Sequence, residues 1–240
     1  MLHGGVRVFG GTFFVFSDYL KGALRLSALQ NLPVTYVFTH DSIAVGEDGP
    51  THEPIEHLAS LRTIPNTYVF RPADATETQA AWYLSQKTND RPTSIVLTRQ
   101  NLPILENSSF EKVAKGAYVV YETAVDFDTI LIATGSEVAL AIDVARELEK
   151  DGSKVRVVSM PSVELFEEQS KEYKEELLPL NIRRRVSLEM GNSALWYKYV
   201  GLDGLAIGID KFGASAPANK VIEEYGFTVE AVVEKIKNEL

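Results

Sequence analysis

The sequence predicts an α/β protein made of two three-layer domains, each built on a mainly parallel sheet. Short apolar segments alternate with helical stretches along nearly all of the 240 residues, a pattern typical of parallel strands that are covered on both faces. The alternation pauses at the polar segment 107–109 and then restarts. We therefore expect one domain at residues 1–108 and a second at residues 109–240.

The first domain is expected to be truncated at its N-terminus, because a glycine-rich start runs directly into a strand-like segment. Asp18 suits the N-cap of a helix, and Pro54 suits the first turn of another. Asp74 and Glu77 have the spacing of a capping box. The expected strands are residues 6–9, 34–39, 67–70 and 94–98, and the expected helices are residues 18–31, 53–61 and 74–87.

The second domain repeats the alternation of strand and helix. Gly135 follows an apolar segment and opens a long helix, which Gly152 ends. A charged helical stretch has a break near Ser170, and Thr228 suits the cap of a last helix. The expected strands are residues 117–122, 129–134, 155–159, 185–189 and 205–209, and the expected helices are residues 136–151, 164–178 and 229–240.

Composition excludes several classes of protein. The formal net charge is −9, which argues against a nucleic-acid surface because such a surface needs clustered lysine and arginine. The chain has no cysteine, so it has neither disulfides nor thiolate metal sites. No signal peptide and no apolar run of spanning length are visible. We predict a cytoplasmic protein whose partners are neither nucleic acid nor membrane.

The most polar part of the chain follows the predicted strand at residues 34–39. It holds three of the four histidines, at positions 40, 52 and 57, and carries glycines and prolines typical of a loop. Arg99 follows the strand at residues 94–98. Because the carboxyl ends of parallel strands meet at one sheet edge, we expect Arg99 and His40 to lie close together.

Three aromatic residues precede this loop in the chain. Phe13, Phe16 and Tyr19 are spaced three residues apart, which puts them on one face if the segment is helical. Such a stripe either packs into the core or forms a wall for a flat ring. The spacing alone leaves both interpretations open.

Other kinds of site fit the polar residues less well. His52 and His57 are five residues apart with Pro54 between them, so they do not match the helical zinc pattern, which needs a spacing of four. The turn at Gly135 enters a helix and could hold an anion on backbone amides, but such turns are common without a ligand. Imidazoles for proton transfer and an arginine for a phosphate or carboxylate remain. The residues alone therefore indicate sugar- or acid-phosphate chemistry, with or without a flat cofactor.

The motifs resemble those of the transketolase family, and the resemblance covers essentially the whole chain. The run from Thr39 to His52, THDSIAVGEDGPTH, is long and specific. The other matching segments are residues 3–5, 11–13, 71–74, 94–103, 208–210, 212–217 and 224–228.

The resemblance implies transfer of a two-carbon ketol unit from a ketose phosphate to an aldose phosphate, in the pentose phosphate pathway. The family uses thiamin diphosphate with Mg²⁺ or Ca²⁺, and the cofactor carries the chemistry. By matching motif positions, the cofactor's aminopyrimidine ring would contact Phe13, Phe16 and Tyr19. His40 and Arg99 would hold the substrate phosphate and Asp48 a substrate hydroxyl. His52 would contact the reacting oxygens and, with His40, would be catalytic; no metal ligand is expected here.

The sequence departs from the family in what it lacks. No GDG metal motif occurs, and the family's cofactor-activating glutamate precedes the matched part. The chain thus resembles the end of the pyrimidine-binding domain followed by the carboxyl-terminal domain of a homodimer. We expect it to be inactive alone and not to bind the cofactor without a partner or an amino-terminal part.

Three alternatives stay open. The chain could be an assembly subunit of a split transketolase without activity of its own. It could also belong to dihydroxyacetone synthase, which this segment hardly distinguishes. The third is 1-deoxyxylulose-5-phosphate synthase, which shares the DGPTH core but is disfavoured by the segments at residues 40–43 and 99–103.

Overall fold

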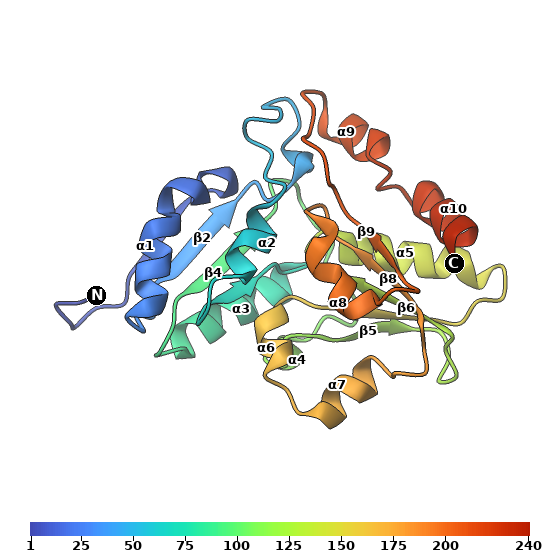
Figure 1. The fold of residues 1–240 in the computed structure, drawn as a ribbon, viewed down its shortest axis with the longest axis horizontal. Helices are drawn as coiled ribbons and strands as arrows, with labels where there is room; N and C mark the ends of the chain where they lie inside the picture. The colour runs from blue at the N-terminus through green and yellow to red at the C-terminus, as the bar shows by residue number, and fades with distance from the viewer.

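A computed structural model describes residues 1–240 as two α/β units that lie side by side (Figure 1). The sheet of the first unit has the order β1-β2-β4-β3, and all its strands are parallel. Its strands are β1 (Phe9–Phe13), β2 (Thr35–Thr39), β3 (Tyr68–Phe70) and β4 (Thr93–Leu97). The parallel sheet confirms the predicted class for this half of the chain.

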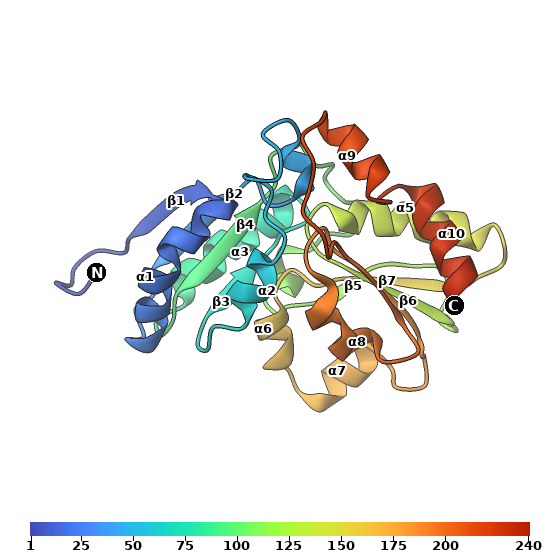
Figure 2. The same cartoon turned by 45° about the horizontal axis from the view of Figure 1, so that its top comes forward.

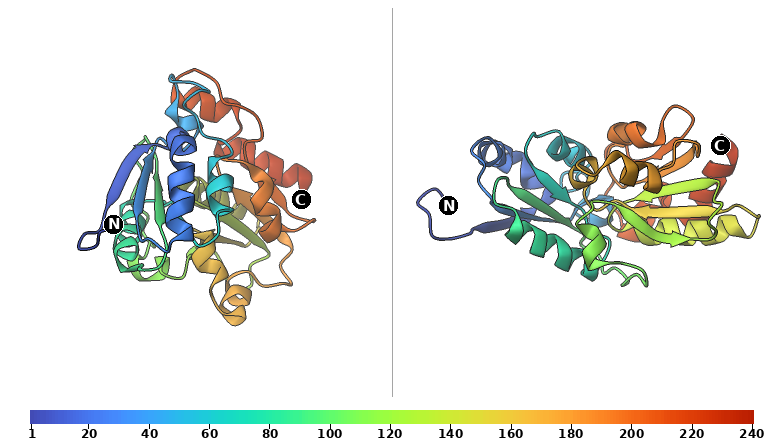
Figure 3. Two further views of the ribbon diagram at one scale, coloured as in Figure 1. Left: turned by 60° about the vertical axis from the view of Figure 1, so that its left-hand side comes forward. Right: turned by 90° about the horizontal axis from the view of Figure 1, so that it is seen from below.

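Helices cover both faces of the first sheet (Figures 2 and 3). On one face, α1 (Ser17–Leu29) and α2 (His57–Arg62) bury Leu24 and Leu58 against Phe38 of β2. On the other face, α3 (Ala75–Lys87) buries two alanines in the cluster that contains Ile95 of β4. Two short 3₁₀ helices complete the unit, η1 (Phe14–Phe16) and η2 (Ile43–Val45).

The second sheet has the order β5-β7-β6-β8-β9, and only the edge strand β5 is antiparallel. Helices α5 and α10 pack on one face, and α6, α7 and α8 lie over the other. The strands are β5 (Tyr118–Glu122), β6 (Thr129–Ala133), β7 (Val155–Ser159), β8 (Arg184–Leu188) and β9 (Leu205–Ile207). The remaining helices are α4 (Phe110–Val113), which packs on α3 of the first unit, and α5 (Glu137–Glu149), α6 (Val163–Glu167), α7 (Lys171–Leu177), η3 (Ser193–Trp196), α8 (Tyr197–Val200), α9 (Ala218–Glu224) and α10 (Val229–Glu239).

Several local predictions are confirmed. The Asp74 side chain accepts a hydrogen bond from the Glu77 amide at 2.9 Å, which is the cap half of a capping box, whereas the Glu77 carboxylate accepts from the Ala73 amide at 2.7 Å rather than from that of Asp74. Thr228 caps α10 in the same way, and the charged helix does break, at residues 168–170. In each case the deciding side chain bonds within its own turn, so the sequence carries the whole signal.

Other predictions are wrong. The first strand is β1 rather than residues 6–9, so Phe13 ends a strand and does not lie on a helix. Asp18 does not cap α1, which begins at Ser17 without a side-chain cap. The second helix begins at His57, because the segment from Glu53 packs as a loop against the second unit. The helices α4, α8 and α9 are too short to show a periodic pattern, and the prediction missed them.

A buried ionic network joins the two units. Arg71 follows β3 and is fully buried, and its guanidinium contacts Asp41 of the first unit at 2.9 Å and Glu137 of the second. The same side chain donates to the Thr134 carbonyl at 2.9 Å. Burial alone would lower the pKa of Arg71, but Glu137 and Asp41 outweigh it and raise that pKa. Arg71 therefore stays charged at the centre of the interface.

A second arginine extends the network. Arg62 of α2 makes a bidentate pair with Glu189, which follows β8, at 2.7 and 2.8 Å. Glu189 also accepts hydrogen bonds from the Thr134 hydroxyl at 2.5 Å and from the Trp196 indole at 3.0 Å. Burial raises the pKa of Glu189, but the two arginines outweigh burial and hold it at about 2.

No helix of the chain is long and apolar enough to cross a bilayer.

Candidate functional site

The candidate site lies at the carboxyl edge of the first sheet, where three parallel strands end in register. Phe13 of β1 pairs with Thr39 of β2, and Thr39 pairs with Leu97 of β4. His40 directly follows β2, and Arg99 lies two residues beyond β4. The topology therefore gathers Phe13, His40 and Arg99, as the sequence predicted for the last two.

His40 has a strained and well-defined position. Its φ is 63°, a left-handed conformation that is uncommon for residues other than glycine. The ring stacks on Phe13 with centroids 3.7 Å apart, and Nδ1 lies 3.0 Å from the Thr39 hydroxyl. Burial and the nearby Arg99 lower the pKa of His40. A neutral imidazole with a free Nε2 can share a hydrogen bond with a sugar or phosphate oxygen.

The loop from Gly46 to His52 brings the remaining polar groups. Asp48 is exposed at the tip of the loop and makes no ion pair or hydrogen bond within the chain, although its charge acts on His40. His52 is half-buried, with Nδ1 2.9 Å from the Thr51 hydroxyl. Its ring meets the ring of Phe16 edge-on at 5.6 Å. The loop thus faces the aromatic residues.

The aromatic residues form a continuous row. Phe13 and Phe16 are parallel within 5° at a centroid distance of 6.3 Å, and Phe16 and Tyr19 are 6.1 Å apart. Phe13 and Phe16 are half-buried, whereas Tyr19 is 86% exposed. The predicted single helical face is wrong, since Phe13 belongs to β1, but the three rings do line one wall. None of the three is part of the buried core.

Arg99 is the free cation of the site. It is exposed and makes no ion pair or hydrogen bond within the chain. An unpaired guanidinium beside a neutral imidazole suits an anionic ligand such as a phosphate. The geometry supports binding of an anionic ligand at this sheet edge.

The residues present fit a flat ring better than a metal diphosphate. Phe16 offers a partly exposed aromatic face, as a heteroaromatic ring needs for stacking. The one cluster of three metal-ligating side chains is Asp18, Glu56 and His57. His57 is buried against Phe14, and none of the three side chains is one of the predicted site residues.

The structure shows what surrounds His57 and the turn at Gly135. His57 packs at the start of α2 with 5% exposure, so it is not open to a ligand. The turn at Gly135 does not hold an anion, because the Gly135 amide donates to the Arg71 carbonyl at 3.0 Å. The Arg71 guanidinium fills the space above that turn. A cation of the other unit therefore occupies the position.

Sequence reasoning missed Glu53, which follows His52. Glu53 is 2% exposed, and neither carboxyl oxygen has a hydrogen-bond partner. Burial raises its pKa to about 7, and the nearby backbone amides of Ala214 and Gly46, which do not reach hydrogen-bonding geometry, oppose the rise only in part. The available signal was the placement of a glutamate between the polar loop and the apolar Pro54–Ile55 pair.

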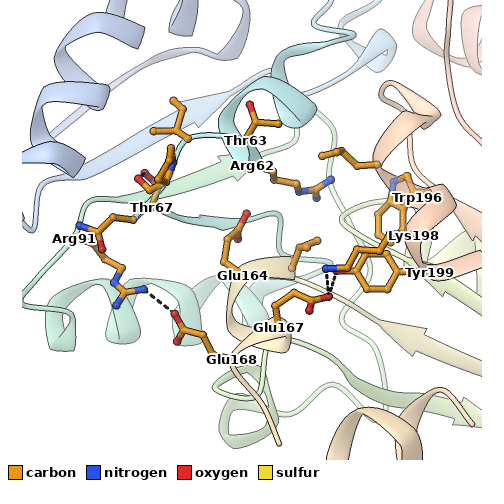
Figure 4. A pocket seen from close by; sticks show the side chains of 15 residues that line it. Arg62, Thr63, Thr67, Arg91, Glu164, Glu167, Glu168, Trp196, Lys198 and Tyr199 are labelled. Carbon is orange, nitrogen blue, oxygen red and sulfur yellow. Dashed lines mark hydrogen bonds and ion pairs between the residues drawn. The ribbon is translucent and has the colours of Figure 1, made fainter. Parts of the chain in front are cut away.

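A cavity of about 410 Å³ lies between the units, away from the candidate site (Figure 4). It opens beside residues 63–67 and Arg91, which precede β3 and β4, and hence at the opposite edge of the sheet. Two pairs of its charged side chains contact each other, Arg91 with Glu168 at 2.7 Å and Lys198 with Glu167 at 2.8 Å. None of the predicted site residues lines it.

Comparison with known proteins decides the family. A profile of the transketolase pyrimidine-binding domain matches residues 1–104, and one of the transketolase-like C-terminal domain matches residues 116–228. The chain belongs to the transketolase family. A probable transketolase of Streptococcus pneumoniae serotype 4 is 70% identical over 99% of this chain. The alignment covers 36% of that relative, so the chain spans about a third of its length.

Solved transketolases share the fold of the chain. Transketolase from Leishmania mexicana superposes with a TM-score of 0.94 at 45% identity, covering 99% of this chain and 34% of that one. A split-gene transketolase, described as an inactive β4 tetramer, gives a TM-score of 0.79 at 26% identity. This chain covers 76% of that protein. Both α/β units are therefore transketolase folds.

Proposed function

We propose that this chain supplies part of the active site of a transketolase. The reaction would transfer a two-carbon ketol unit from a ketose phosphate to an aldose phosphate, in the cytoplasmic pentose phosphate pathway. The observation that supports this most is the convergence of two imidazoles, an unpaired arginine and an aromatic wall at one sheet edge, in a chain of this family.

The site residues are proposed to bind two groups, the aminopyrimidine ring of the cofactor and the phosphate of the substrate. Phe16 stacks on the aminopyrimidine ring of thiamin diphosphate, with Phe13 and Tyr19 beside it. Arg99 and the Nε2 atom of His40 bind the substrate phosphate, because Arg99 has no competing partner in the chain and His40 Nδ1 is engaged by Thr39. The bound thiamin diphosphate supplies the carbanion chemistry.

The loop handles the sugar. Asp48 accepts a hydrogen bond from a substrate hydroxyl, since its carboxylate has no partner within the chain. His52 holds its Nδ1 against Thr51, which leaves Nε2 to take a proton from a substrate oxygen and return it. A proton shuttle at this position needs no further group from this chain.

The diphosphate and its Mg²⁺ are proposed to bind residues of a partner or an amino-terminal part. An exposed apolar edge supports such a partner: Phe9 of β1 is 71% exposed and Val6 is 63% exposed. β1 is also an edge strand with one unpaired side, and exposed edges of this kind invite association. We infer that the complete enzyme is a homodimer.

The split-gene relative favours a second candidate. That protein is described as inactive, and its fold matches both units of this chain. The second proposal is therefore an assembly subunit that contributes half of a site and has no activity of its own.

A reconstitution assay tests both proposals. The chain would be assayed with xylulose 5-phosphate, ribose 5-phosphate, thiamin diphosphate and Mg²⁺, alone and after mixing with the remaining amino-terminal portion of the pneumococcal relative. We expect no turnover alone and turnover in the mixture, lost when the chain carries Arg99→Ala. Turnover by the isolated chain would refute the division of the site. Turnover with pyruvate as donor would instead identify 1-deoxyxylulose-5-phosphate synthase.

A further inference from the structure

The polar loop of the candidate site does not stand free. It packs on the segment from Gly213 to Ala218, which belongs to the second unit and leads into α9. The Ser215 hydroxyl donates to the Glu47 carbonyl at 2.6 Å. A Cβ on Gly49 would lie 3.0 Å from Ser215, and one on Gly46 would lie 3.1 Å from the Ala218 nitrogen. The two backbones therefore approach as closely as glycine permits.

Both loop glycines are also required by backbone conformation. Gly46 and Gly49 have φ values of 83° and 73°, which L side chains rarely adopt. The loop's own hydrogen bonds, such as that from the His52 amide to the Gly49 carbonyl at 2.9 Å, close only a local turn. The orientation of that turn relative to the sheet depends on the contact with the second unit.

Glu53 lies at the base of this contact. A Cβ on Gly213 would overlap the Glu53 carboxyl group, so the carboxyl fills the space that a side chain at position 213 would need. The φ of Gly213 lies outside the positive region, so its backbone does not require glycine. The absence of a side chain at Gly213 is explained by Glu53 alone.

We propose that the segment Gly213–Ala218 is a clamp that positions Asp48 and His52, with Glu53 as the positioning residue at its base. The substrate-binding roles of Asp48 and His52 rest on the proposed function, whereas the clamp is a contact within this chain and does not depend on those roles. It gives the second unit a role in a site that otherwise belongs to the first.

A double-mutant cycle on the 240-residue chain tests the clamp by NMR. Gly213→Ala places a methyl group against the Glu53 carboxyl and is expected to shift the amide signals of Gly46–Thr51 and the imidazole signals of His52. The hydrogen-exchange rates of the loop amides should rise by about tenfold. Gly22→Ala is the matched control, because a Cβ there meets nothing within 4 Å.

The second arm removes the group that the methyl would meet. In a Glu53→Ala background the two carboxyl atoms nearest to the added methyl group are gone, and the Cβ at position 53 remains 3.4 Å away. Gly213→Ala should then cause no further shift of the loop signals. Glu53→Gln, which keeps the shape of the side chain, should retain the wild-type loop signals, whereas Glu53→Ala should not.

The clamp is overturned if Gly213→Ala leaves the loop signals unchanged, or if its effect is the same with and without the Glu53 side chain. If Gly213→Ala does not fold, the contrast between Glu53→Gln and Glu53→Ala decides, and equal loop signals in both overturn the proposal. Loop shifts in a chain that shows no ketol transfer in any mixture would support the clamp and refute the proposed function. Ketol transfer with an unaffected loop would do the reverse.

Discussion

One cluster of charged side chains surrounds Arg71 and another lies at the candidate site, and they differ in whether their charges are paired within the chain. Around Arg71, each charged group is buried and faces an opposite charge, and two of the ion pairs, Arg71–Glu137 and Arg62–Glu189, cross between the units. At the carboxyl edge, Arg99 and Asp48 are exposed without a partner in the chain. The first cluster uses its charges to join two units, and the second leaves them available to a ligand. Pairing, rather than the presence of charge, separates structural from functional polar residues here.

The largest expected effect comes from the centre of the buried cluster. Arg71→Met removes one cation and leaves Asp41 and Glu137 buried without it, so the free energy of unfolding should fall by about 3–5 kcal/mol. Urea denaturation measures this change. Arg146→Met, at an exposed pair with Asp143, is the matched control and should change stability by less than about 1 kcal/mol. Equal losses of stability in Arg71→Met and Arg146→Met would contradict the distinction between buried, paired charges and exposed ones.

Glu53 resembles the first cluster in being buried and the second cluster in having no oppositely charged partner. Its pKa rises from the usual 4.5 to about 7 in the fold, so the folded chain keeps a proton that the unfolded chain has lost. Stability should therefore be highest below pH 4.5 as far as this group is concerned, and should fall by up to about 3 kcal/mol as pH rises to 7. Glu53→Gln should remove that fall in a series of denaturation curves. The exposed control Glu106→Gln should leave it in place.

A smaller effect is expected where the network depends on a hydroxyl. The Thr134 hydroxyl accepts from Arg71 at 3.0 Å and donates to Glu189. Thr134→Val keeps the shape and removes both hydrogen bonds, so unfolding should become easier by about 1–3 kcal/mol. Thr63→Val, at an exposed threonine, should change the midpoint of thermal unfolding much less. A neutral outcome at Thr134 would mean that the charges hold the interface without the hydroxyl.

The smallest effect on stability is predicted at Arg99. Arg99→Ala should change the free energy of unfolding by no more than about 0.5 kcal/mol, because the side chain makes no contact that the fold needs. In the reconstituted enzyme the same change should raise the KM for the sugar phosphate by about 10- to 100-fold through loss of a charge-assisted contact. Arg25→Ala, an exposed arginine of α1, should alter neither quantity. Strong destabilisation by Arg99→Ala would place Arg99 with the buried cluster.

The sequence predicted well what depends on local pattern. The order of the strands and of the longer helices, the parallel sheets and the Asp74 cap follow from residues close in the chain. The meeting of His40 and Arg99 also followed, since parallel strands bring their carboxyl ends together. Motif resemblance, and not spacing, assigned roles to Asp48 and His52, and those roles stay predictions.

What depended on contacts between the units was out of reach. Glu53 was expected in a helix because Pro54 suits a first turn, but packing against Gly213 keeps the segment as a loop. The turn at Gly135 had the pattern of an anion site, and only the fold shows that Arg71 fills it. The position of Phe13 in β1 was missed because Gly10 and Gly11 break the apolar pattern of that strand.

The Arg71 network also bears on how a gene for such a protein can be divided. A cut at the junction of the two units would separate Arg62 from Glu189 and Arg71 from Glu137, so each half would lose ion pairs that join it to the other. A cut ahead of the first unit separates nothing in the network. The split-gene relative keeps counterparts of both units on one polypeptide. The two units are therefore held as one piece by a network of five charged side chains.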